Sequence, residues 1–126
     1  MKTNLDQTEN QSPHEWPDSL DALIAAPKHH RLLFQNDQVR VLETRIARGD
    51  TTAVHTHRWP SVIHTLSGSD FIRRDGNGKI LLDTRASQSQ PAEFGWSGPL
   101  PPHSIENVGN AEIRIIMVEL KDNPHK

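Results

Sequence analysis

The sequence predicts an all-β domain, a jelly roll or closed barrel, with one short helix near its N-terminus. From residue 29 onward, short segments rich in β-forming residues alternate with turn residues at even spacing. The segment Asp75–Gly78 separates two such runs and is typical of a β-hairpin. Hydrophobic residues make up 33% of the chain and charged residues 24%, which suits strands that each need only one apolar face.

The region before the strands divides into a polar tail and a short helix. Residues 1–15 are polar and are predicted to be disordered. Asp18 or Ser19 could cap a helix that runs through Ala25 and that Pro27 ends. Its apolar residues recur at helical spacing, so it should pack across the body as a strap. Residues 16–121 are expected to form a single domain, and residues 122–126 a polar C-terminal tail.

The strands themselves are predicted from alternation and from the turn residues between them. Gly, Asn, Asp and Ser clusters separate the apolar segments, and residues 86–90 are polar and should form a loop. No internal repeat is apparent. The predicted strands cover residues 31–34, 39–46, 52–57, 61–66, 71–74, 79–82, 92–96, 104–108 and 113–120.

Composition excludes several classes of function. A formal net charge of −2 argues against a nucleic-acid surface, which would need clustered Lys and Arg. No run approaches the roughly 20 apolar residues of a membrane span, and the first residues lack the apolar core of a signal peptide. Cysteine is absent, so disulfides and thiolate ligands are excluded and any metal must use histidine, carboxylate or water. A cytoplasmic location is the expectation.

A pair of histidines, His55 and His57, carries the strongest chemical signal. Residues at i and i+2 point to the same face of a strand, so both imidazoles should face one side. His103, brought alongside by a neighbouring strand, would complete a three-nitrogen site for a divalent transition metal. Because the chain holds eight histidines, such a pair arises readily by chance. The neighbouring residues must therefore carry the argument.

Those neighbours follow the first sequence motif of the cupin superfamily. Gly49, five residues, His55-Thr56-His57 and then Gly68 match that motif at every landmark. Ser61 occupies the position at which the motif has a glutamate. The segment is thus similar to a cupin metal-binding motif that lacks its carboxylate.

The second cupin motif is matched in part. His103 and Asn107 have the motif's spacing, whereas its Pro-x-Gly positions read Gly98-Pro99-Leu100 here. The resemblance covers about residues 32–121, most of the chain, and is to small single-domain cupins of the RmlC-like type. It implies a cupin-type jelly-roll β-barrel or sandwich with a pocket at one end.

The resemblance implies one divalent ion, Fe, Mn, Ni, Cu or Zn, held by His55, His57 and His103. A serine hydroxyl is a poor ligand for these ions, so water or substrate is expected beside Ser61. The arrangement looks similar to cupin dioxygenases that use three histidines without the glutamate. A dioxygenase-like, metal-dependent oxidoreductase acting on a small polar organic molecule is therefore the first interpretation.

Two further interpretations stay open. The protein could be a non-catalytic cupin that binds a small ligand or metal as a sensor or accessory module. It could also be a metal-free, isomerase-like cupin in which histidines act as acid and base. Under each interpretation the partner is a small molecule, with no nucleic acid and no membrane. Cupins of this size commonly form homodimers, and an unpaired edge strand gives a physical reason for that.

Other side chains are candidates for the pocket. Strict alternation after Ser61 turns His64 away, whereas a bulge or a longer loop would turn it inward as a fourth ligand or proton-transfer group. Trp59 could wall the pocket rim or pack within the turn. Trp96 should face the core or the pocket just before the second motif.

The remaining polar residues are assigned from alternation. Glu106 should face away from His103, and Asn107 should hold a turn. Arg45, Arg73 and Arg74 could anchor an anionic substrate if they point inward, although adjacent Arg73 and Arg74 must point opposite ways. No role is assigned to four further histidines, His14, His29, His30 and His125.

Overall fold

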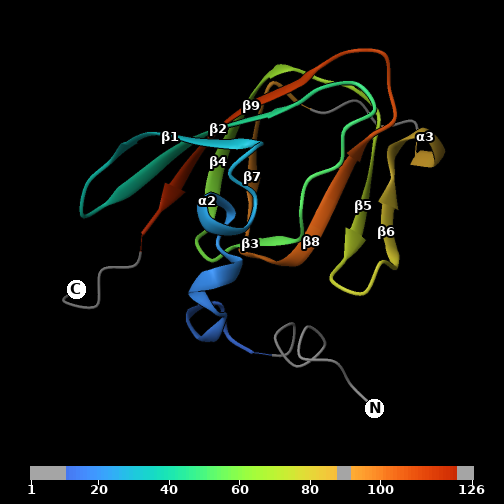
Figure 1. The fold of residues 1–126 in the computed structure, drawn as a ribbon. Helices are drawn as coiled ribbons and strands as arrows, with labels where there is room; N and C mark the ends of the chain where they lie inside the picture. Colours follow the sequence, from blue (N-terminus) through green and yellow to red (C-terminus); the bar gives the residue numbers. More distant parts are fainter. Residues whose placement is uncertain (1–10, 88–91, 122–126) are drawn as a thin grey trace.

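The structure, a computed structural model, describes residues 11–87 and 92–121. Two antiparallel sheets in these residues face each other, as the jelly-roll prediction requires (Figure 1). One sheet has the strand order β1-β2-β9-β4-β7 and the other β3-β8-β5-β6. The strands are β1 (His30–Gln35), β2 (Val39–Ile46), β3 (His55–His57), β4 (Ser61–Ser67), β5 (Phe71–Asp75), β6 (Ile80–Asp83), β7 (Phe94–Ser97), β8 (Leu100–Asn107) and β9 (Ile113–Leu120).

The centre of the larger sheet is the pair β2 and β9, which are in unbroken register from Val39 opposite Leu120 to Ile46 opposite Ile113. Alternate residues of both strands point between the sheets. Leu42, Ile46, Ile113 and Met117 are buried there. The same inward rows also carry Arg40 and Glu119, both buried, so the interior is apolar at one end and polar at the other.

The N-terminal strap is present but begins later than predicted. The 3-10 turn η2 (Asp18–Leu20) precedes a single helical turn, α2 (Ala22–Ala25). The cap of α2 is Asp21, whose side chain accepts from the Leu23 N–H at 3.0 Å, so neither Asp18 nor Ser19 has that role. In Figure 1, α2 lies beside β1 and β3.

The two predicted tails are described only in part. Residues 1–10 and 122–126 lie outside the described residues, and the 3-10 turn η1 (Pro13–Glu15) lies within the stretch that was predicted to be disordered. The helix α3 (Thr84–Ser87) replaces the start of the loop predicted over residues 86–90, whose last three residues lie outside the described part. In the described residues no helix is long and apolar enough to cross a membrane.

The predicted hairpin joins β5 and β6. Asp75 organises its turn, since its side chain accepts from the Asn77 N–H at 2.8 Å and the Lys79 N–H at 3.0 Å. Gly78 has φ +90°, which favours glycine at that position. Asn107 has the predicted turn role: it donates to the Ile46 and Ala111 carbonyls at 2.9 and 2.8 Å.

Candidate metal centre

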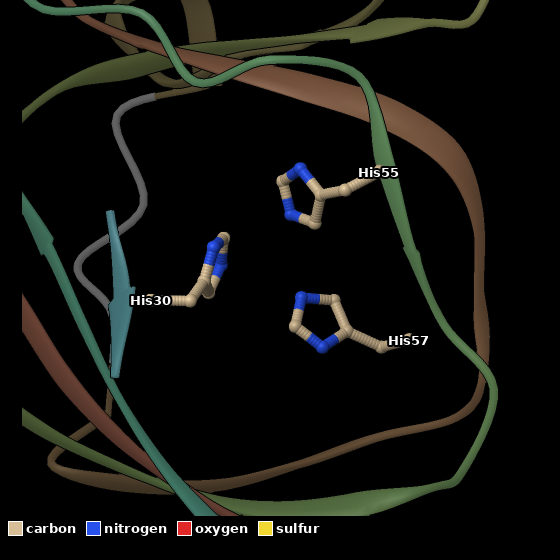
Figure 2. Close-up of side chains that lie close together, drawn as sticks. All are labelled: His30, His55 and His57. Carbon is tan, nitrogen blue, oxygen red and sulfur yellow. The ribbon is translucent and has the colours of Figure 1, made fainter. Parts of the chain in front are cut away.

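Four imidazoles gather in one cavity between the sheets. His55 and His57 come from β3, His103 from β8 and His30 from β1, and all four are buried. Figure 2 shows the His30 ring facing those of His55 and His57 from the opposite side. The ligand atoms of these three residues all lie within 4.8 Å of one another. The His103 ring lies 4.4 Å from that of His55 and 5.8 Å from that of His57.

Strand pairing explains how these side chains meet. His55 is the cross-strand partner of His103, so their side chains leave the sheet on the same face. His57 follows on that face by alternation. His30 begins β1 opposite Thr44 of β2, which puts it on the inner face of the other sheet. The site is thus built from both layers of the sandwich.

Each of the four rings is held by a hydrogen bond to its Nδ1 atom. A carbonyl oxygen can only accept, so each Nδ1 that contacts one carries the proton and leaves the Nε2 lone pair available. An ionised carboxylate has the same effect. The acceptors are the carbonyls of Ala26 for His30 (3.0 Å), Ala53 for His55 (2.7 Å) and Pro101 for His103 (2.7 Å), and the Glu119 carboxylate for His57 (2.9 Å).

Burial keeps three of these rings neutral at pH 7. Loss of hydration, with the nearby imidazoles adding to it, lowers the pKa of His30 to about 4 and that of His103 to about 3. The same causes hold the pKa of His55 well below its usual range. Metal binding requires neutral imidazole, so these groups need no deprotonation at neutral pH. The donor set therefore fits a divalent transition metal.

A chain of buried charges supports His57 from behind. The Glu119 side chain is fully buried, and its second carboxylate oxygen accepts from Arg40 Nε at 2.6 Å. Arg40 also donates twice to Asp21, at 3.0 and 2.9 Å. Burial raises the pKa of Asp21, but the Arg40 guanidinium more than offsets this and holds it below its usual range. The strap and His57 are thereby connected through three side chains.

The cavity contains every expected histidine ligand and one that was not expected. His55, His57 and His103 all line it, as does His30, to which the sequence analysis assigned no role. The sequence did not single out His30 because it comes from the opposite sheet, and only the long-range closure of the sandwich brings it there. His29, its neighbour in sequence, instead contacts Asp50 at 3.0 Å.

Glu119 could have been found by alternation. It occupies the same inward row as Ile113, Ile115 and Met117, where an acidic side chain needs a partner. It also lies directly across from Ser61, the position where the cupin motif has its glutamate. Ser61 is fully buried, and its hydroxyl oxygen has no hydrogen-bond partner among the described residues.

His64 faces away from the cavity, as strict alternation predicts. Ile63 lines the cavity, whereas His64 contacts Glu93 at 3.2 Å and stacks on the Phe94 ring at 4.3 Å. The bulge that would have turned His64 inward is therefore wrong: the irregularity in β4 lies between Thr65 and Ser67, beyond His64.

The two tryptophans have other positions. Trp96 is 63% exposed, so its predicted inward orientation is wrong. It pairs across strands with Val62, which points outward, and cross-strand partners share a face. Trp59 is not among the described residues that line the histidine cavity; the Arg40 guanidinium carbon lies 5.0 Å and the Lys121 Nζ 5.7 Å from its ring centre.

The histidine cavity is small, about 100 Å³. Apart from the histidines and Arg73, its walls are mostly apolar, which suits a site that restricts access of water. A larger hollow of about 910 Å³ lies at Thr65, Phe71 and Gly109, and none of the described residues that line it is a histidine. We place the candidate metal site at the smaller cavity because the imidazoles that could bind a metal lie there. The apolar walls are Ile46, Ile63, Phe71, Leu100, Ile105, Ile113, Ile115 and Met117.

Comparisons with solved structures identify the fold. The chain is similar to a cupin domain from Bordetella pertussis (TM-score 0.59, 17% identity, 74% of this chain and 92% of the other). It is also similar to an RmlC-like cupin with a double-stranded β-helix fold from Methanocaldococcus jannaschii (TM-score 0.53, 9% identity, 72% and 77%). A third is the polyketide cyclase RemF from Streptomyces resistomycificus (TM-score 0.52, 21% identity, 79% and 70%). The sequence matches no family model and no curated protein.

Proposed function

Because the chain has the cupin fold, we propose that it binds one divalent transition metal ion through four imidazoles and acts on a small polar organic molecule. The proposed ligands are His30, His55, His57 and His103. Two of these, His55 and His57, belong both to the set that the sequence predicts and to the tight cluster that includes His30.

One observation supports this proposal above the others: every Nδ1 of the four rings already has an oxygen partner. Four buried rings with the same tautomer and the same free nitrogen are what a metal site requires, whereas packing alone would not need them. The low pKa values of His30 and His103 agree, because these rings stay neutral throughout the neutral pH range.

A divalent ion held by neutral imidazoles keeps its full charge and supplies Lewis-acid or oxygen-activating chemistry. The chain's own residues hold the ligand rings in orientation, restrict water through the apolar walls, and leave room for a small molecule only. We propose a dioxygenase-like oxidoreductase as the reaction class. A metal-free acid–base reaction has less support, because imidazoles with pKa values of about 3 and 4 are weak bases at neutral pH.

The decisive test is metal analysis of untagged protein, before and after reconstitution with Fe, Mn, Ni, Cu and Zn. About one ion per chain is expected, and the double variant His55→Gln/His57→Gln should retain none. His64→Gln is the matched control, because His64 faces away from the cavity. Wild-type protein that takes up none of the five metals would exclude the proposal.

A second measurement separates an enzyme from a metal-binding module. Oxygen consumption by the loaded protein should be followed with a panel of thiols, diketones and hydroxy acids. A metal-dependent rate with one class supports the oxidoreductase. Tight metal binding with no consumption across the panel supports the non-catalytic module instead.

A further inference from the structure

Arg73 is the one cavity-lining residue whose charge the metal site does not explain, among the residues described as lining it. It lies in β5, between Ile105 of β8 and Leu82 of β6, so both neighbouring strands fix its backbone. Its side chain lines the histidine cavity together with His103. The Nε atom is buried and has no hydrogen-bond partner among residues 11–87 and 92–121.

Two other arginines, Arg74 and Arg40, each have a carboxylate partner. Arg74, on the opposite face of β5, donates to Glu106 at 2.9 Å. Arg40, which is also buried, is paired with two carboxylates. For Arg73 no carboxylate within ion-pair distance is found in the part of the chain that the structure describes. A half-buried guanidinium without an anion is energetically unfavourable, and burial alone lowers the pKa of Arg73 without making it neutral at pH 7.

Arg73 also lies where two hollows meet. The histidine cavity shares Arg73, Leu100 and His103 with an outer hollow of about 360 Å³. The outer hollow also contains Asp75, whose Oδ1 atom is already engaged by two backbone N–H groups of its turn. A molecule that extends from the outer hollow toward the imidazoles would therefore pass the guanidinium.

We propose that Arg73 binds the carboxylate of the substrate, whose adjacent donor atom reaches the histidine cluster. This inference rests on the proposed function and specifies its substrate class: small carboxylic acids with a hydroxyl, carbonyl or thiol on the neighbouring carbon. The planar guanidinium fork matches a carboxylate with two parallel hydrogen bonds. The volume of about 100 Å³ beside the histidines restricts the acid to a few heavy atoms.

Cobalt-loaded protein provides a test that does not depend on turnover, since the visible spectrum of Co²⁺ reports changes among its ligands. The probes are glycolate, pyruvate and thioglycolate, with ethylene glycol as the uncharged counterpart and inorganic phosphate as the other anion. We expect at least one of the three acids to change the spectrum of the wild-type protein, and ethylene glycol to leave it unchanged.

The variants are Arg73→Gln, Arg73→Lys and the matched control Arg74→Gln. Arg73→Gln should weaken carboxylate binding by about tenfold or more, because it removes a charge-assisted hydrogen bond. Arg73→Lys should keep part of the wild-type affinity for the carboxylate, and Arg74→Gln should keep all of it. Cobalt content should be the same in all of them, since no hydrogen bond joins Arg73 or Arg74 to an Nδ1 acceptor of the site among the described residues.

The outcomes separate this inference from the proposed function. Wild-type protein that binds neither cobalt nor any of the five metals named above would exclude the metal site and the carboxylate role with it. If cobalt binds but none of the acids changes the spectrum, or Arg73→Gln binds them as tightly as Arg74→Gln, only the Arg73 role is overturned. Phosphate binding that depends on Arg73, without carboxylate binding, would also overturn the assigned substrate class.

Discussion

Glu119 lies directly across the sheet from Ser61, and its carboxylate accepts a hydrogen bond from His57 at 2.9 Å. The carboxylate that is missing from the histidine motif is thus present one strand away. There it contacts the Nδ1 atom of His57, a proposed ligand, whereas the glutamate of the cupin motif is itself a ligand. Its position behind the ring makes it a positioning group, which fixes the tautomer and orientation of the imidazole.

Replacing this carboxylate should weaken metal binding without removing a ligand. We expect Glu119→Gln to lower the affinity for Zn²⁺ by about 10- to 100-fold, as for other groups that support a ligand ring. It should also destabilise the fold by about 3–5 kcal/mol, because Arg40 loses a buried ionic partner. Chelator competition measures the affinity, and urea unfolding of the metal-free protein measures the stability.

Glu93→Gln is the control for that experiment. Glu93 is an exposed carboxylate that also contacts a histidine, His64, but outside the cavity. Equal Zn²⁺ affinity in the two glutamine variants would show that Glu119 has no positioning role.

The ligand count can be tested at His30, which the sequence does not single out. His30→Gln should lower Zn²⁺ affinity as much as His103→Gln does, because each removes one Nε2 donor from the same cavity. His29→Gln is the matched control, since His29 points to Asp50 instead. Unchanged affinity in His30→Gln would leave a three-histidine site with His103. Unchanged affinity in His103→Gln, with a loss in His30→Gln, would leave a site made of His30, His55 and His57.

The parts of this protein that the sequence could predict are those set by local pattern. Strict alternation and turn residues predicted the bounds of β2 and β9, and the same period placed His55 and His57 on one face. The predicted third strand was too long: β3 begins at His55, and the Ala53 carbonyl accepts from the His55 ring. Thr52 still donates its N–H to the Ile105 carbonyl of β8 at 2.9 Å, but it is not part of a continuous strand with His55.

The parts that the sequence could not predict depend on contacts between distant segments. His30 joins the site only when β1 closes over β3. Asp21, rather than Asp18, caps the helix because Arg40 of β2 also holds its carboxylate. Trp96 points outward because β7 takes its register from Val62. In each case a residue far along the chain decides between locally equivalent alternatives.

Acid should destabilise the metal-free protein before any carboxylate titrates. The folded-state pKa values of His30, His55 and His103 are lowered, whereas the unfolded chain has ordinary values near 6.5. The unfolded state therefore binds more protons below about pH 6.5, and stability is lost as the pH falls from there. Each buried ring contributes roughly 1 kcal/mol per pH unit in that range.

The measurement is the urea midpoint of chelator-treated protein between pH 7.5 and pH 5. We expect a flat profile above about pH 6.5 and a steady decline below it. His30→Gln should have a shallower decline than the wild type, and the exposed-side variant His64→Gln should match the wild type. A midpoint that does not change between pH 6.5 and pH 5 would contradict neutral, buried imidazoles in the metal-free state.

The outer face of the larger sheet gives the homodimer prediction a specific surface. Cross-strand partners form one apolar row from edge to edge: Phe34, Val41, Val118, Val62 and Trp96. Three of these side chains are exposed by 39% or more. Large apolar patches on a protein surface mark interaction sites, and a two-fold axis through such a face would bury the patch against itself.

We therefore expect wild-type protein to be a dimer by light scattering at micromolar concentration, and Val62→Lys to be a monomer with unchanged metal content. A lysine within the row would have to be buried without a partner in the dimer but would be solvated in the monomer. Ile80→Lys is the control, because Ile80 is an exposed apolar residue of the other sheet. A monomeric wild type would refute the prediction, and a Val62→Lys dimer would move the interface to another surface.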